Sequence, residues 1–425
     1  MATAPIQESV ASELREAAVL AVESIRSQPA RSALAIIGVV IGIVTVVLVS
    51  STLVGLRNSV ALLFRELGTD NIFAFHTSGE PYAAGTSQDV KRPPLKAEFA
   101  PRIAALGPSI RDVGIELIVP VVTGTRAITA RAGTNESDTL LVEGISPNFY
   151  DVVGAEFTGG RPFTDYEERA RAQVAVLGAS IARALFGPRS SVGQSFLLGG
   201  DRYYVVGELA PRRGTFFGEN RNDRVVAIPV NTARLKYPDA ENTVLYIRAY
   251  PGLREEARLE AATILRLLRN VPPGEPDNFA LNTADQIIAQ FDRLGSQIFW
   301  ATIALAAVSL VIGGIGIANV MIISVTERTR EIGVRLAIGA KRGEVLRQFL
   351  FEAAILSGTG GLAGVALATA LGLLAAFLAP TFPAAPPWWA VLSGLTTSVF
   401  VGILAGYWPA RRAAGLDPVE ALRYE

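Results

Sequence analysis

The sequence predicts an α-helical membrane protein with four transmembrane helices and a large, two-lobed α/β extracytoplasmic domain between spans 1 and 2. Three long runs carry no charged residue, and a stretch of mixed charge, Arg57 to Arg293, separates the first run from the second. A proline-rich break divides the third run into two spans. A basic segment, Thr326 to Gln348, lies between the second run and the third. Because Lys and Arg concentrate on the cytoplasmic side of a membrane, this segment marks a cytosolic loop and sets the topology.

The composition agrees with a membrane protein and excludes several other classes. Half of the residues are apolar, 18% are charged, and the mean hydropathy is +0.35. The chain has no cysteine, and its single histidine, His76, is best explained as a solvated surface residue. Zinc sites, histidine-based triads and thiolate chemistry are therefore not expected. The net charge of zero gives no reason to expect nucleic acid. We expect no enzymatic activity, metal or cofactor in this chain.

The N-terminal part predicts a cytosolic segment followed by the first span. Residues 8 to 27 form an amphipathic pattern, which suits a helix lying along the membrane surface, although a packed soluble helix has the same pattern. We assign residues 1–31 to this cytosolic segment and 32–56 to transmembrane helix 1. Arg15, Arg26 and Arg31 precede the span and place the N-terminus inside.

Residues 57–297 are assigned to the extracytoplasmic domain. Heptad-like apolar residues bracket it and predict a paired stalk at 57–67 and 284–297, formed by Leu56, Val60, Leu63, Leu67, Ile287, Phe291, Leu294 and Ile298. One lobe is expected to be an α/β lobe built from two chain-distant halves. The first half has a helix near 98–106 and a strand over 113–122. The second half has a strand over 243–248, a helix over 253–269 and a strand near 279–282. A β-rich lobe at about 123–230 is inserted between them, with strands near 127–132, 140–143, 174–177, 195–198, 203–206 and 225–228.

The C-terminal part predicts three more spans. We assign 298–325 to transmembrane helix 2, 326–349 to a cytosolic coupling loop, 350–378 to transmembrane helix 3, 379–387 to an external loop, 388–410 to transmembrane helix 4 and 411–425 to a cytosolic tail. The external loop is rich in proline and has no Lys or Arg, whereas Arg411, Arg412 and Arg423 hold the C-terminus inside.

Several motifs resemble the FtsX-like permease family, specifically its branch of MacB-type macrolide-export and lipoprotein-release permeases with a MacB-like periplasmic domain. The run SVTERTREIGVR begins at Ser324, YWPARRAA begins at Tyr407, and LDPVEALRY begins at Leu416. The domain after span 1 contains LGTDN from Leu67 and GISPNFY from Gly144. The resemblance covers essentially the whole chain.

The resemblance implies a permease subunit of an ABC transporter in the bacterial inner membrane. A cytosolic ATPase would drive movements of the extracytoplasmic domain and thereby the export or extraction of a hydrophobic, peptide or lipoprotein cargo. The sequence has no G-x-x-x-x-G-K-[ST] motif, so ATP and Mg²⁺ are expected on a separate ATPase subunit. A second permease copy, giving a homodimer or heterodimer, and membrane lipids are further expected partners. A periplasmic adaptor and an outer-membrane channel are allowed. The alternative is a membrane anchor that transmits ATPase motion to an extracytoplasmic hydrolase or sensor.

Two groups of residues are the candidate functional positions. The ATPase-coupling group consists of Glu327, Arg328, Arg330, Glu331, Gly333, Arg335, Gly339, Ala340 and Lys341. The alternative explanation for its charges is that they only fix topology and touch lipid headgroups. Small residues spaced for close helix packing are Gly38, Gly42, Gly314, Ala318, Gly360, Gly364, Gly402 and Gly406. Packing within one subunit explains these pairs as well as a dimer contact does.

Overall fold

The structure is a computed structural model that describes residues 29–66, 68, 70–77, 92–120, 122–123, 126–137, 140–212, 220–378 and 385–422. The predicted amphipathic helix at 8–27 lies outside these residues, as do Leu67 and most of the external loop. The chain divides into two compact units. The helical unit comprises residues up to Leu56 together with Leu294–Glu425, and the sheet unit comprises Arg57–Arg293.

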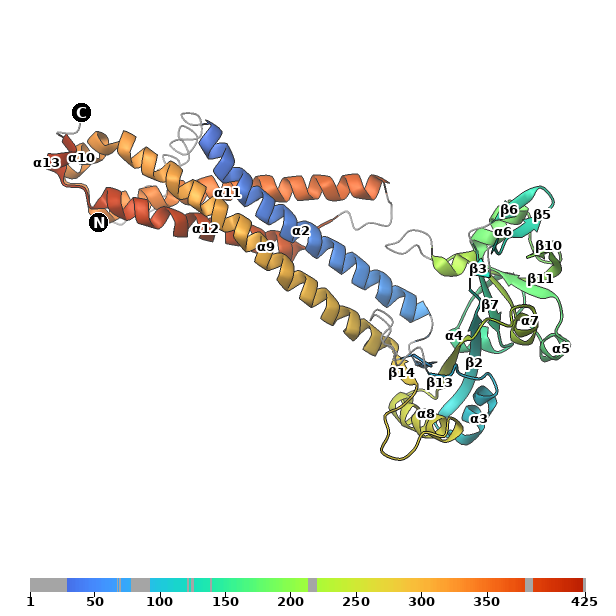
Figure 1. The fold of residues 1–425 in the computed structure, drawn as a ribbon. Helices are drawn as coiled ribbons and strands as arrows, with labels where there is room; N and C mark the ends of the chain where they lie inside the picture. Colours follow the sequence, from blue (N-terminus) through green and yellow to red (C-terminus); the bar gives the residue numbers. More distant parts are fainter. Residues whose placement is uncertain are drawn as a thin grey trace, which may run out of the picture. The chain divides into compact units, whose positions relative to one another are not determined.

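The described residues include four helices that are long and apolar enough to cross a membrane (Figure 1). These are α2 (Pro29–Glu66), α9 (Ala284–Glu327), α11 (Arg342–Leu378) and α12 (Trp388–Ala414). Two short helices complete the helical unit, α10 (Thr329–Ala337) and α13 (Pro418–Leu422). Large apolar side chains such as Trp300, Ile312 and Phe377 are exposed on the long helices, as expected for surfaces that face lipid. The chain is a multi-pass membrane protein.

Glycines allow α2 to approach α9 and α11 at backbone distance. A Cβ atom built on Gly38 would lie 2.7 Å from the Cα of Gly313 on α9. On α11, a Cβ on Gly360 would lie 3.3 Å from the side chain of Val39, and one on Gly364 would lie 3.0 Å from that of Ile43. Larger residues at these positions would push the helices apart.

Helices α11 and α12 pack by the same device. A Cβ on Gly402 would lie 1.9 Å from the Oγ of Ser357, and one on Gly406 would lie 2.4 Å from the Cβ of Ala353. Gly314 has only ordinary contacts with α12, with its nearest neighbour at 3.4 Å. The glycines of the predicted pairs therefore contact other helices of the same chain.

The sheet unit is built on a mixed sheet of 12 strands within the described residues, in the order β14-β1-β13-β2-β7-β12-β9-β11-β10-β5-β6, with β8 paired to β11. Its strands are β1 (Asn71–Phe75), β2 (Ile110–Ile118), β5 (Ala130–Ala132), β6 (Asn135–Ser137), β7 (Leu141–Ile145), β8 (Phe157–Gly160), β9 (Val174–Leu177), β10 (Ser195–Leu198), β11 (Asp201–Leu209), β12 (Val225–Pro229), β13 (Asn242–Ala249) and β14 (Ala280–Thr283). A separate hairpin joins β3 (Val122–Thr123) to β4 (Arg126–Ala127).

The predicted pairing of chain-distant halves is confirmed. Strand β13 pairs with both β1 and β2, and β14 pairs with β1, all antiparallel. Helices α3 (Phe99–Leu106) and α8 (Arg254–Leu268) contribute Ile103 and Leu265 to one core with this part of the sheet. The sheet itself continues without a break into the inserted segment, because β2 also pairs with β7. The two predicted lobes therefore share one sheet.

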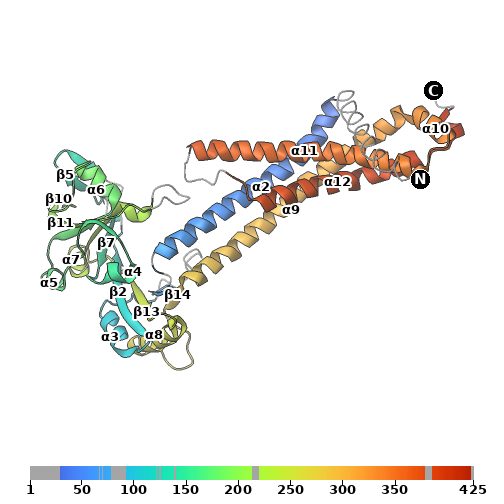
Figure 2. The same cartoon turned by 180° about the vertical axis from the view of Figure 1, so that it is seen from behind.

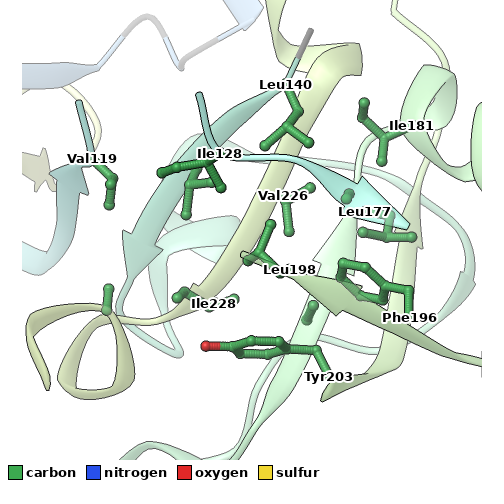
Figure 3. Close-up of a cluster of buried hydrophobic side chains, with 14 of the residues drawn as sticks. Val119, Ile128, Leu140, Leu177, Ile181, Phe196, Leu198, Tyr203, Val226 and Ile228 are labelled. Carbon is green, nitrogen blue, oxygen red and sulfur yellow. The ribbon is translucent and has the colours of Figure 1, made fainter. Parts of the chain in front are cut away.

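The inserted segment contains helices that its description as β-rich missed. They are α4 (Phe149–Val153), α5 (Asp165–Arg169), α6 (Ala179–Phe186) and the 3₁₀ turn η2 (Arg221–Arg224), and α7 (Val230–Lys236) follows directly after the segment. With five to eight residues, the α-helices are too short to show a helical period in the sequence. Helix α6 packs Ile181 and Leu185 into a core with strand residues such as Phe196 and Tyr203 (Figure 3).

The first turn of α9 is fixed to the sheet unit by hydrogen bonds and by burial. The backbone N–H of Gln286 donates to the Thr283 hydroxyl at 3.3 Å, and the backbone N–H of Thr283 donates to Gln286 Oε1 at 3.0 Å. The two hydrogen bonds form a reciprocal helix cap. Ile287, one residue further along, is completely buried in a core that also contains Phe73 of β1. The start of α9 therefore belongs to the sheet unit.

A second reciprocal cap fixes α5. Thr164 accepts a hydrogen bond from the Glu167 amide, and Glu167 accepts one from the Thr164 amide. Arg161 donates to both carboxylate oxygens of Glu167 at 2.8 Å. These Arg161 hydrogen bonds lower the pKa of Glu167 from its ordinary value of 4.5 to about 2, against the opposing effect of burial.

We predict that Gly402→Ala destabilises the helical unit. The new methyl group would overlap Ser357 and the Ala353 carbonyl oxygen, which lies 2.6 Å from its position, and overpacking of this kind costs about 1–3 kcal/mol. The measurement is the thermal unfolding midpoint of the protein in detergent. Gly358→Ala is the matched control, because its Cβ would meet Val399 at an ordinary 3.6 Å. Equal midpoints for the two variants would contradict the packing.

We predict that Glu167→Gln destabilises the sheet unit in a pH-dependent way. Because folding depresses the pKa of Glu167, its contribution is complete above pH 4.5 and is lost as the pH falls towards about 2. Arg161 is half exposed, so we expect a loss of about 1 kcal/mol at pH 7 and none near pH 2. Hydrogen exchange of α5 at both pH values measures this difference. Exposed Glu136→Gln should have no effect, and a loss that persists at pH 2 would contradict the assignment.

Candidate functional site

The connection between α9 and α11 is a short helix with a defined break at each end (Figure 2). Helix α9 ends at Glu327, and α10 begins at Thr329, whose hydroxyl donates to the Val325 carbonyl at 2.9 Å. After α10 the chain turns through Gly339 at φ +103°, a conformation that favours glycine. The Lys341 amide then donates to Glu344 Oε2 at 3.1 Å at the start of α11.

One face of α10 packs against α13. Ile332 and Gly333 are buried, and a Cβ on Gly333 would lie only 2.5 Å from the Cβ of Ala421. The Asp417 side chain accepts a hydrogen bond from the Val419 amide at 2.8 Å and so caps α13. The C-terminal LDPVEALRY motif is explained by this contact, because it builds the small helix that covers α10.

Two arginines of the coupling group are directed towards α11. Arg328 lies 3.6 Å from a carboxylate oxygen of Glu352, which is 2% exposed. Arg335 donates to Gln348 Oε1 at 2.9 Å and to Glu331 Oε1 at 2.5 Å. Arg328 therefore faces α11, whereas Arg335 ties α10 to α11 and keeps an exposed side chain.

The opposite face of α10 is exposed. We define the outer face as Arg330, Val334, Ala337 and Ile338, which follow one another at helical spacing. Ile338 is 81% exposed and Val334 is 44% exposed. Arg330 forms no ion pair with any residue that the structure describes. The outer face therefore presents one cation and two large apolar side chains to the surroundings.

The structure therefore divides the predicted coupling residues into two groups. Exposed are Glu327, Arg330, Glu331, Gly339 and Lys341, whereas Arg328, Gly333 and Arg335 hold the segment in place and Ala340 is half-buried. Sequence reasoning missed Val334 and Ile338, although their helical spacing from Arg330 was visible.

The stalk prediction needs a correction. Val60 and Ile287 are buried, and Leu56, Leu63 and Phe291 are half-buried, but Leu294 is 41% exposed and Ile298 is 52% exposed. The inward stripe of α9 instead passes through Gly295, where a Cβ atom would lie 3.9 Å from the side chain of Leu53. A straight helix has a period of 3.6 residues rather than 3.5, which moves the inward face by one position here.

Four long apolar helices, a folded domain between the first two and a short connecting helix between the second and third define a multi-pass membrane protein with one large domain outside the spans. The chain matches the model described as MacB-like periplasmic core domain over residues 32–263 and the model described as FtsX-like permease C-terminal over residues 303–418. It belongs to the MacB-type family of ABC-transporter permeases.

Individual relatives agree with this family. The chain is 33% identical over 396 residues to the pyoverdine export ATP-binding/permease protein PvdT of Pseudomonas syringae pv. tomato, covering 93% of this chain and 57% of the relative. It is 31% identical over 416 residues to the macrolide export ATP-binding/permease protein MacB 2 of Aeromonas hydrophila, covering 97% and 61%. The chain thus spans about three fifths of the length of these relatives. The crystal structure of the periplasmic region of MacB from Actinobacillus actinomycetemcomitans is 16% identical, covers 54% of this chain and 95% of its own, and has a TM-score of 0.41.

We predict that Arg328 and Glu352 are energetically coupled. Arg328→Met leaves a buried carboxylate unpaired, which costs about 3 kcal/mol, whereas Arg328→Met combined with Glu352→Gln removes both charges and restores most of the stability. A double-mutant cycle from unfolding of the protein in detergent measures the coupling. Additive effects of the two single substitutions would show that the pair makes no contribution.

Proposed function

We propose that this chain is the permease subunit of an ABC transporter and that a separate ATPase subunit docks on the outer face of α10. ATP-driven movement of that subunit would pass along α9 to the sheet unit and drive the export or extraction of a hydrophobic, peptide or lipoprotein cargo. The observation that carries the proposal is α10 itself, a short helix clamped on one side by α13 and α11 and exposed on the other with Arg330 and Ile338.

The relatives support an ATP-dependent partner. PvdT and MacB 2 are named ATP-binding/permease proteins, and this chain corresponds to about three fifths of each. The 425 residues contain no G-x-x-x-x-G-K-[ST] motif, so we assign the binding of ATP and Mg²⁺ to the partner subunit. The chain would then act as a mechanical element without enzymatic activity of its own.

The proposed route of motion follows α9. This helix is uninterrupted from Ala284 to Glu327, and its first turn is capped by Thr283 and buried through Ile287. Arg57 of α2 also pairs with Asp292 of α9 at 2.8 Å. These contacts fix the first turns of α9 within the sheet unit, and motion of the helix would act on the sheet through them.

The remaining assignments follow the positive-inside pattern and the family. We place the chain in the bacterial inner membrane with both termini and α10 in the cytosol and the sheet unit outside. The permease would act with a second permease copy, as a homodimer or heterodimer. A periplasmic adaptor and an outer-membrane channel are compatible partners.

We predict that Arg330→Glu and Ile338→Asp each strongly weaken ATPase binding. Reversing or adding a charge in a desolvated interface typically costs about 2–5 kcal/mol, which weakens binding by about 30-fold or more. The measurement is co-purification of the ATPase with the membrane-inserted permease. Glu331→Lys is a less specific test, because it also breaks the Glu331–Arg335 pair.

Arg411→Glu is the matched control for this experiment. Arg411 is an exposed arginine at the end of α12, so the control makes the same charge change away from the outer face. We expect it to retain ATPase binding. Wild-type binding by both Arg330→Glu and Ile338→Asp would refute docking on this face.

A further inference from the structure

A groove of about 160 Å³ lies beside α10, between the end of α9, the end of α12 and α13. Its apolar wall includes Val325, Leu416 and Ala421. Two side chains of opposite charge, Arg412 of α12 and Glu420 of α13, also line it. The outer face of α10 does not take part, so this groove is distinct from the proposed ATPase surface.

The groove lies where two spans change from apolar to charged sequence. The charge-free run of α9 ends at Thr326, which lines the groove, and that of α12 ends at Ala410. Arg412 lies over the exposed ring of Trp408, 5.8 Å from its centroid. Tryptophan and arginine at the end of a span are typical of the level of lipid headgroups.

The charges of the groove match a zwitterion. Both Arg412 and Glu420 are exposed, and no ion pair joins them within the described part of the chain. A purely anionic headgroup would satisfy Arg412 but would be repelled by Glu420. A phosphate linked to a primary ammonium group satisfies both, with charge-assisted hydrogen bonds to each.

We propose that this groove binds the headgroup of phosphatidylethanolamine, with its phosphate at Arg412 and its ammonium group at Glu420. The groove of about 160 Å³ has room for a small polar headgroup and leaves the acyl chains in the bilayer. Phosphatidylcholine carries the same charges, but its quaternary nitrogen has no N–H group to donate to Glu420. The groove should therefore prefer the primary amine.

Occupation of the groove would strengthen the support of α10. Thr329, the first residue of α10, lines the groove together with Ala421, which packs against Gly333. A lipid bound there touches the end of α9, the start of α10 and the helix that covers it.

The experiment measures lipid binding to the full-length protein by native mass spectrometry, with phosphatidylethanolamine, phosphatidylcholine and phosphatidylglycerol of identical acyl chains. We expect phosphatidylethanolamine to bind most tightly. Arg412→Gln should weaken its binding by about fivefold, the contribution of one basic residue to a headgroup contact. Arg411→Gln is the matched control, because this neighbouring arginine is exposed but does not line the groove. Glu420→Gln should remove the preference over phosphatidylcholine.

Three results would overturn the proposal. Equal binding of the three lipids, or equal losses in Arg411→Gln and Arg412→Gln, would indicate unspecific surrounding lipid. Tighter binding of phosphatidylglycerol would indicate an anion site without a role for Glu420.

Finally, a photo-crosslinking residue at position 326 should capture phosphatidylethanolamine in membranes. Capture of residues 1–28 or of the ATPase would assign the groove to a protein segment.

Discussion

Close backbone contact at glycine is the constraint on which the helical unit depends. Apolar side chains gain little by exchanging lipid for another helix, so the helices are held by the closeness of their fit. Val39 of α2 shows this most directly, because Gly313 of α9 and Gly360 of α11 both pack against it. One residue thereby fixes the two helices that α10 connects. The position of the candidate coupling segment is set within the membrane-spanning bundle, several turns from α10.

The charges around α10 divide according to their neighbours rather than their sign. Arg328 and Arg335 have partners on α11 and act as internal ties, whereas Arg330, between them in sequence, is exposed. A helix with one packed face and one exposed face can contact a partner while its packing against the rest of the chain is retained. A lipid bound in the groove between α9, α12 and α13 would add contacts to the helices that hold α10. The membrane itself would then help to keep α10 in place.

The sequence was most informative where one physical rule dominates. Lipid excludes charge, so three charge-free runs, the last divided by a proline-rich loop, were sufficient to find the four long helices. Strands such as Val174–Leu177 and Ser195–Leu198 were also predicted with their observed bounds. Predictions failed where neighbours distant in sequence decide the outcome. Arg328 turns inward because Glu352 lies on the neighbouring helix, and the two lobes share a sheet because β2 pairs with β7. Both contacts join residues that are distant in sequence. The exposure of Leu294 reflects the small difference between periods of 3.5 and 3.6 residues.

The reciprocal cap at the start of α9 limits the motions that this helix can make. Thr283 and Gln286 are joined by two hydrogen bonds at the start of the helix, and Ile287 is enclosed by the sheet core. Rotating the first turn of α9 about the helix axis would break both hydrogen bonds and withdraw Ile287 from that core. The first turn of α9 is therefore held in one rotational orientation against the sheet core.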